Sequence, residues 1–244
     1  MTRLAALIGL LLTTTAAAGT PKAPPTDGCV SKALARNAVS FRTADGVRLS
    51  GLQLGSGPRG IVLAHELRAS LCNWLPFART LAGSGYRVLL FDSRNAGVSG
   101  VAPYPKSVQL QKDLLAAEKE LLRRGAKRIV LGGASAGGTA AMTAAASAGP
   151  ALASVIVLSS PAQYIQMDAE AAAKRVTAPS FFAVGRGDTD FVGEMQKLYD
   201  ASAAERKQLE ILETGAHGTD MLKGSTAGVL RPKLVAFLAA AFAQ

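Results

Sequence analysis

The chain has 244 residues, is 49% apolar and contains 25 glycines, which favours one domain with a substantial core over two domains of ordinary size. Its 27 Lys and Arg outnumber its 17 Asp and Glu and give a net charge of +10. Because the basic residues are scattered and are not clustered with aromatic residues, the composition argues against a nucleic-acid-binding protein and favours an ordinary basic surface.

The N-terminus has the parts of a secretory signal peptide. Arg3 supplies positive charge, residues 4–12 form a short apolar run, and small residues follow at Ala16 to Ala18. We predict a signal peptide over residues 1–18, a lead-in over residues 19–38, and a secreted or periplasmic location. The apolar run is shorter than the ~20 residues that cross a bilayer, so no stable membrane insertion is expected after cleavage.

The chain contains two cysteines, Cys29 and Cys72. Export to an oxidising compartment makes them a plausible disulfide pair that would tie the N-terminal segment to the rest of the protein. Two free, buried thiols are the alternative.

Beyond the lead-in, the chain alternates between predicted strands and predicted helices. Apolar and polar residues alternate on both sides of Asp45 and Gly46, which predicts an antiparallel hairpin over residues 39–54. Short, near-continuous apolar runs then predict buried parallel strands, and a last strand precedes the final helix. These strands are expected at residues 60–65, 86–92, 128–133, 154–160, 180–185 and 208–212.

The segments between these strands carry apolar residues at three- and four-residue spacing, which predicts helices. The helices are expected at residues 73–83, 107–124, 135–148, 191–203 and 226–243. Alternation of this kind implies right-handed crossovers and an α/β fold in which helices cover both faces of a mostly parallel sheet. Ligands bind such sheets at the carboxyl ends of the strands, so the residues that follow each strand are the candidates for function.

One of these residues is Ser135, in the stretch Gly133-Ala134-Ser135-Ala136-Gly137. The pattern G-x-S-x-G between a strand and a helix is typical of an activated serine on a strained turn. Glycines allow the strand and helix backbones to approach, and the N-terminus of the helix directs amide hydrogens toward an oxyanion. The alternative is that Ser135 is only a small residue in a tight connection.

A nucleophilic serine needs a base and an acid, and the chain offers two histidines. His217 lies in a glycine-flanked loop after a strand and is the expected base, whereas His65 ends an early strand and is expected to have a structural or oxyanion-loop role. Asp188, three residues beyond Gly185, is the expected acid. Asp190 is the close rival, although it could instead cap the following helix.

The order Ser135, Asp188, His217, each after the appropriate strand, resembles that of the α/β-hydrolases. "YRVLLFDSRNAGVSG" (residues 86–100) and "IVLAHELRASLCNWLPFARTLAGSGY" (residues 61–86) also resemble segments of this family. The resemblance begins near Val39 and implies a hydrolase domain over residues 39–244, with little or no cap.

The resemblance further implies two-step acyl transfer, with the amides of Ala136 and Leu67 as oxyanion donors. Glu66 stands where the family usually has glycine, which is similar to dienelactone-hydrolase-like members. Those members usually carry a cysteine nucleophile, whereas this chain has Ser135. Glu66 is therefore expected to be either a solvated loop carboxylate or a neighbour that polarises the site.

Residues 159–176 are too few for a large cap, so we expect a small or open substrate site that involves Glu66, with the acyl chain meeting Leu67, Trp74, Tyr164 and Ile165. The expected function is cleavage of a small-molecule carboxylic ester, with lactone or amide hydrolysis as alternatives. A non-catalytic secreted binding protein on the same scaffold is the rival from another class. No cofactor or metal is expected, since the histidines follow separate strands and the cysteines are expected to pair.

Overall fold

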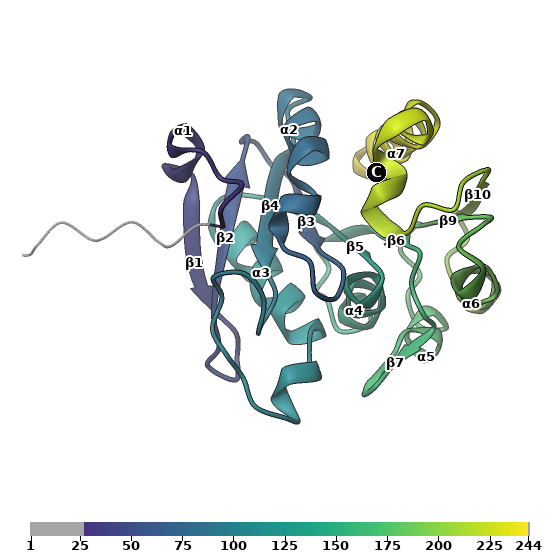
Figure 1. Ribbon diagram of the computed structural model, residues 1–244, viewed down its shortest axis with the longest axis horizontal. Helices are drawn as coiled ribbons and strands as arrows, with labels where there is room; N and C mark the ends of the chain where they lie inside the picture. Colours follow the sequence, from purple (N-terminus) through teal and green to yellow (C-terminus); the bar gives the residue numbers. More distant parts are fainter. Residues whose placement is uncertain (1–26, 244) are drawn as a thin grey trace, which may run out of the picture.

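The computed structural model describes residues 27–243. At its centre is an eight-stranded sheet in the order β1-β2-β4-β3-β5-β6-β9-β10 (Figure 1). β2 pairs antiparallel with both β1 and β4, and all other neighbours are parallel. The strands are β1 (Ala38–Arg42), β2 (Arg48–Leu54), β3 (Arg59–Ala64), β4 (Arg87–Asp92), β5 (Arg128–Ala134), β6 (Leu152–Leu158), β9 (Ser180–Gly185) and β10 (Lys207–Leu212). The predicted N-terminal hairpin and mostly parallel sheet are confirmed.

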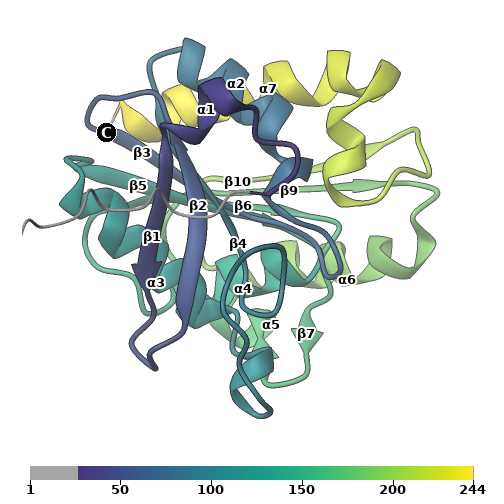
Figure 2. The ribbon, with the colours of Figure 1, turned by 60° about the vertical axis from the view of Figure 1, so that its left-hand side comes forward.

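Helices cover both faces of the sheet, as Figures 1 and 2 show from two directions. One face carries α1 (Lys32–Ala35), α2 (Leu75–Gly83) and α7 (Ala227–Phe242). The other face carries α3 (Gln111–Arg123), α4 (Ala136–Ala145), α5 (Ala169–Ala173) and α6 (Thr189–Ala201). Short 3-10 helices complete the fold: η1 (Leu71–Asn73), η2 (Lys106–Val108), η3 (Gly218–Leu222) and η4 (Gly224–Thr226).

The central strands have apolar residues on both sides because both faces are covered. In β3, Val62 and Ala64 join the core beneath α3 and α4, whereas Ile61 and Leu63 join the core beneath α2 and α7. Successive residues of a strand point to opposite faces, so a strand buried on both must be apolar throughout. This is why the parallel strands could be recognised in the sequence as continuous apolar runs.

The segment between β6 and β9 forms a small hairpin, β7 (Gln163–Tyr164) and β8 (Met167–Asp168), followed by α5. This segment is the short connection that the sequence predicts. In the described part of the chain, it forms no large cap over the sheet. Met167 and Ala169 of this segment are buried in the core, which fixes the hairpin against α4. Ser135, which follows β5, is half-buried, and Arg186 and Gly187, which follow β9, are exposed.

Among residues 27–243, one helical stretch, Gly224–Phe242, is long and apolar enough to cross a membrane by length and composition. In this structure Leu230, Leu234 and Leu238 recur on one side of the helix and are buried against the sheet. About a fifth of this apolar stretch is buried. One stripe of α7 therefore covers the sheet, and the rest of the helix lies at the surface.

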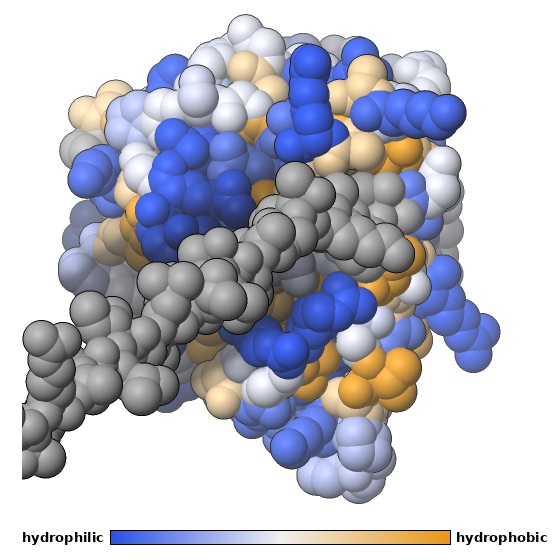
Figure 3. Space-filling model, turned by 90° about the vertical axis from the view of Figure 1, so that its left-hand side faces the viewer, coloured by the Kyte–Doolittle hydropathy of each residue, from blue (hydrophilic) through white to orange (hydrophobic). Residues whose placement is uncertain are grey.

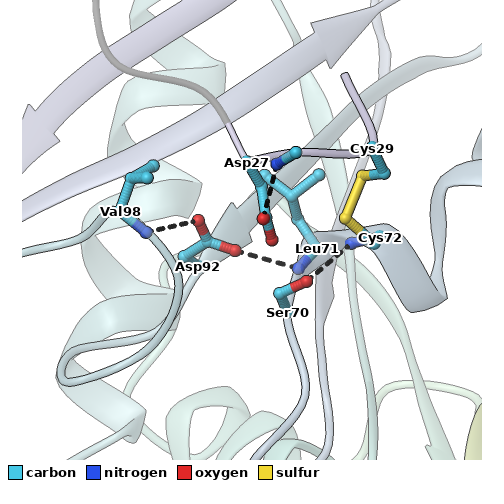
Figure 4. Close-up of a disulfide and its surroundings, with 8 residues drawn as sticks. Asp27, Cys29, Ser70, Leu71, Cys72, Asp92 and Val98 are labelled. Carbon is cyan, nitrogen blue, oxygen red and sulfur yellow. Dashed lines mark hydrogen bonds between the residues drawn. A yellow bond between two sulfur atoms is a disulfide. The ribbon is translucent and has the colours of Figure 1, made fainter. Parts of the chain in front are cut away.

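The expected disulfide between Cys29 and Cys72 is present, with a Cα–Cα distance of 5.8 Å. Cys72 belongs to η1, where the Ser70 hydroxyl accepts a hydrogen bond from its amide and the neighbouring Leu71 amide donates to Asp92 (Figure 4). Val30, next to Cys29, is buried in the core. The described part of the predicted lead-in is thus fastened to the sheet, while the predicted signal peptide, residues 1–18, lies outside the described residues.

The face of the molecule on the side of β1 carries hydrophilic residues interspersed with smaller hydrophobic patches (Figure 3). β1 is an edge strand, and its outward residues Ser40 and Arg42 are polar and exposed. Charged and polar residues on an edge strand discourage pairing with another chain. Ser40 and Arg42 therefore protect the open edge of the sheet at β1 against pairing with another chain.

The disulfide should contribute strongly to stability. Cys29 and Cys72 are separated by 43 residues, and closing a loop of this length in the unfolded chain corresponds to about 4 kcal/mol. We expect Cys29→Ala/Cys72→Ala to lower the free energy of unfolding in urea by about this amount, and reduction of the wild-type protein to have the same effect. Equal unfolding midpoints for oxidised and reduced protein would contradict this prediction, as would alkylation of both cysteines without reduction.

Candidate active site

Ser135 lies on a strained turn between β5 and α4. Its backbone has φ 53° and ψ −127°, a conformation that residues with a side chain rarely adopt. A Cβ on Gly133 would lie 2.2 Å from the carbonyl oxygen of Gly137, and a Cβ on Gly137 would lie 2.4 Å from that of His65. Glycine is therefore required at both positions, as the sequence motif indicates.

The turn also prepares the start of α4 for an anionic ligand. Ala136 is the first residue of the helix, where an amide has no acceptor within the helix itself. The aligned peptide dipoles add partial positive charge at this end. Because Ser135 is half-buried and immediately precedes this amide, an oxygen bound near the serine would face the amide of Ala136.

Asp188 and His217 form a hydrogen-bonded pair, with 2.8 Å between Asp188 Oδ2 and His217 Nδ1. A carboxylate only accepts hydrogen bonds, so Nδ1 carries the proton and Nε2 of the neutral ring is left as an acceptor. Side-chain exposure is 34% for His217 and 11% for Asp188. The Phe191 ring packs on the imidazole at a centroid distance of 4.5 Å. Asp190, the rival acid, is exposed in the first turn of α6.

These residues follow strands that end at the same edge of the sheet. Asp188 comes after β9 and His217 after β10, which are parallel neighbours, and β6 separates β9 from β5. A Cβ built on Gly218 would lie 3.3 Å from the Cβ of Ala134. The residue after His217 therefore packs against the residue before Ser135, which brings the His217 loop and the Ser135 turn together.

His65 has a structural role. The ring is buried, its Nδ1 donates to the carbonyl of Glu66 at 2.7 Å, and its Nε2 accepts from the amide of Ser93 at 3.0 Å. Burial lowers the pKa of His65 below its ordinary value, which keeps the ring neutral. Both ring nitrogens are occupied by backbone groups, so His217 is the histidine that is free to exchange a proton.

The loop after β3 is closed by a hydrogen bond of 3.2 Å from the Ala69 amide to the Glu66 carbonyl. Leu67 and Arg68 form the turn, and Arg68 has φ 61°. We call residues 66–69 the oxyanion loop, because the resemblance to α/β-hydrolases implies an oxyanion donor at Leu67. Glu66 is 9% exposed, so it is not the solvated carboxylate that was one of the two expectations.

A cavity of about 380 Å³ adjoins the oxyanion loop. Its walls come from residues 65–69, from the loop after β4, from the segment around η2 and from Tyr164. Glu66, Leu67 and Tyr164, which the sequence predicts to be substrate contacts, line this cavity. Ser135, Asp188 and His217 are not part of the lining, and the oxyanion loop is the part of the cavity wall that follows His65.

Two predicted substrate contacts lie elsewhere. Trp74 is 1% exposed in the core, and its indole N–H donates to the Ala64 carbonyl at 2.9 Å, so the prediction that it meets the acyl chain is wrong. A tryptophan that precedes α2 faces the sheet because burying its ring against the sheet removes a large apolar area from water. Ile165 lies at the turn of the β7–β8 hairpin, is 63% exposed and does not line the cavity.

Two polar residues at the site had no assigned role in the sequence. Thr219 donates to Glu66 through both its amide and its hydroxyl. Asp92 is buried and accepts hydrogen bonds from the amides of Leu71 and Val98, and its burial raises the pKa of the carboxyl group. Asp92 ends a predicted strand, which is a usable signal, but Glu66 and Thr219 are 153 residues apart and no local pattern relates them.

The loop after β4, which forms part of the cavity wall, is held by Arg94. This buried guanidinium contacts Asp113 at 2.7 Å and Asp45 at 2.9 Å, and it also donates to the carbonyl of Lys106. Burial raises the pKa of Asp113 to about 6 even though Arg94 opposes the shift. The charge of Arg94 is thereby satisfied by its neighbours, and the cavity wall is fixed by an ion-pair network.

Comparisons with known proteins agree with this architecture. The family profile described as alpha/beta hydrolase fold matches residues 61–199. In structure the chain is similar to an esterase from Pyrococcus furiosus, with a TM-score of 0.73 and 21% identity over 83% of this chain and 90% of that one. It is also similar to a thermophilic esterase from Thermogutta terrifontis solved with malate bound, with a TM-score of 0.70 and 17% identity over 84% of this chain and 98% of that one.

A curated relative matches a shorter stretch. Bifunctional epoxide hydrolase 2 of Sus scrofa is 35% identical over 92 residues, which are 38% of this chain and 16% of that protein. The match therefore spans a small part of the length of that relative. The family profile, in contrast, covers more than half of this chain. Together with the sheet order and the turn at Ser135, it establishes that the chain belongs to the α/β-hydrolase family.

Proposed function

We propose that the protein is a serine hydrolase that cleaves carboxylic esters, with Ser135 as nucleophile, His217 as base and Asp188 as the acid that orients the base. The observation that carries the proposal is the hydrogen bond of 2.8 Å between Asp188 and His217. It places the proton on Nδ1 and leaves Nε2 able to accept the proton of a serine. The strained turn at Ser135, at the same edge of the sheet, supports the assignment of the nucleophile.

In the first half of the reaction, Ser135 Oγ attacks the ester carbonyl while its proton passes to His217 Nε2. The carbonyl π electrons move to the oxygen, and the amides of Ala136 and Leu67 donate hydrogen bonds to the resulting oxyanion. The tetrahedral intermediate collapses, the bond to the alcohol oxygen breaks, and the alcohol leaves with the proton from His217. Ser135 then carries the acyl group.

In the second half, His217 removes a proton from water, and the hydroxide oxygen attacks the acyl carbon. The same two amides stabilise the second oxyanion. Its collapse breaks the bond to Ser135 Oγ, which recovers its proton from His217, and the carboxylic acid is released. Asp188 stabilises the imidazolium in both halves, and its low exposure strengthens this interaction.

The cavity beside the oxyanion loop supports a substrate of modest size. Its apolar wall includes Leu67, Val108, Leu110 and Tyr164, which suit an alkyl or aryl group. The short β7–β8 and α5 segment offers no large enclosure. A small-molecule ester fits these features, and lactones and amides are tested as alternatives in the same assay.

We also propose that the protein is exported and acts in a secreted or periplasmic location. The Cys29–Cys72 disulfide supports this, because such bonds persist mainly in oxidising compartments. The charged, apolar and small-residue segments of residues 1–18 support a signal peptide, which export would remove.

The nucleophile is tested with a fluorophosphonate probe and p-nitrophenyl acetate. We expect the wild-type protein to be labelled and to turn over the ester, and Ser135→Ala to do neither. Asp188→Asn should reduce kcat by roughly 10⁴-fold, because the base then adopts the wrong tautomer. Asp190→Asn, which changes an exposed carboxylate two residues away, is the matched control and should retain activity.

Absence of labelling at Ser135 together with absence of turnover of esters, lactones and amides would overturn the enzymatic proposal. The non-catalytic binding protein on a hydrolase scaffold would then be the remaining function. Turnover of lactones or amides in preference to esters would keep the serine mechanism and change the substrate class.

The cavity is tested by acyl-chain profiling with p-nitrophenyl esters from acetate to octanoate. Val108→Trp fills part of the cavity and should lower kcat/KM for octanoate by about tenfold or more, while acetate is little affected. Val229→Trp, at a half-exposed valine of α7, is the control and should leave the profile unchanged. Identical profiles for all three proteins would mean that the acyl chain does not occupy this cavity.

A further inference from the structure

We propose that Glu66 is a positioning residue that fixes the loop carrying His217 relative to the oxyanion loop. The inference rests on the proposed function, because it assigns Glu66 a role in aligning the base with Ser135. Glu66 acts through Thr219 and the backbone, and we do not assign it a contact with the substrate. It is therefore distinct in role from Asp188, which binds the imidazole itself.

The link consists of two hydrogen bonds to one carboxylate oxygen. Glu66 Oε1 accepts from the Thr219 amide at 2.6 Å and from the Thr219 hydroxyl at 2.5 Å. The Asn73 side chain also donates to the Thr219 hydroxyl at 3.5 Å. A Cβ on Gly218 would lie 2.7 Å from the same carboxylate oxygen. The carboxylate of Glu66 is therefore in close contact with the two residues that follow His217.

The loop that carries His217 needs such support. Glycines flank the histidine at positions 215 and 218, and Gly218 has φ 55°. His217 precedes η3, and its side chain makes no capping hydrogen bond. Asp188 holds the ring from one side. Because a glycine-rich backbone has many accessible conformations, a second attachment directly after the histidine restricts the position of the ring.

Glu66 belongs at the same time to the oxyanion loop. Its carbonyl oxygen accepts hydrogen bonds from His65 Nδ1 and from the Ala69 amide, which closes the turn that contains Leu67. One residue thus fixes the oxyanion donor through its backbone and the base loop through its side chain. A glycine at this position could provide the first connection and not the second.

The Glu66 carboxylate makes both of its hydrogen bonds to Thr219 through only one of its two oxygens. Among the described residues, Glu66 Oε2 is buried and has no hydrogen-bond partner. Burying a carboxylate oxygen without a partner is unfavourable. A buried polar atom without a partner calls for an explanation, and a positioning role for Glu66 supplies one.

The test compares Glu66→Gln with Glu66→Ala in the full chain, using kcat and KM for p-nitrophenyl acetate and the rate of fluorophosphonate labelling. Glutamine keeps an oxygen that can accept both Thr219 hydrogen bonds, so Glu66→Gln should stay within about threefold of wild type. Glu66→Ala removes the link and should lower kcat and the labelling rate by roughly 10- to 100-fold with KM little changed, because small displacements of catalytic groups have effects of this size.

Variants of Thr219 provide an independent test of the same link. Thr219→Val removes one of the two hydrogen bonds and should slow labelling less than Glu66→Ala, whereas Thr219→Ser should restore the wild-type rate. The double variant Glu66→Ala/Thr219→Val should be no slower than Glu66→Ala, since both substitutions act on one link. If Glu66→Ala does not fold, the contrast between Thr219→Val and Thr219→Ser decides the proposal.

Several outcomes would overturn the positioning role of Glu66. Labelling of Glu66→Ala at the wild-type rate, or equal losses in Glu66→Ala and Glu66→Gln, would remove the positioning role while the serine mechanism stands. Equal rates for Thr219→Val, Thr219→Ser and wild type would do the same. Failure of the wild-type protein to be labelled at Ser135 would instead overturn the proposed function on which the inference rests.

Discussion

The active site depends on the close contact between the start of α4 and the end of β3. A side chain at Gly137 would lie 2.4 Å from the carbonyl of His65, so the two backbones touch without intervening atoms. This contact brings Ser135 beside the oxyanion loop, which begins one residue after His65. Ser135, at this junction, has a positive φ, and the His65 ring is held there by the Glu66 carbonyl.

Much of this arrangement could be predicted from the sequence, because it follows from periodicity and strand order. Strands buried on both faces must be apolar throughout, and the glycines around Ser135 are needed wherever backbones touch. The pairing of Asp188 with His217 follows from two neighbouring parallel strands whose ends share one edge. Ser135, Asp188 and His217 could therefore be selected without knowledge of any tertiary distance.

The contacts beyond this edge could not be predicted, since they depend on where side chains turn in three dimensions. Trp74 was expected to meet the acyl chain, but its N–H donates to the Ala64 carbonyl and its ring is buried in the core. Glu66 and Thr219 are 153 residues apart, and nothing in either local sequence indicates the other. Polar links between distant loops leave no periodic signal.

In the proposed mechanism, two carboxylates hold His217 in different ways. Asp188 contacts the ring and therefore governs where the proton resides, whereas Glu66 contacts the backbone that follows and therefore governs where the ring lies. The first role requires charge, because the proposed reaction forms an imidazolium at His217. The second requires only an acceptor of the right length. An amide can thus replace the second carboxylate and not the first, although both residues are acids that lie within the same small group of loops.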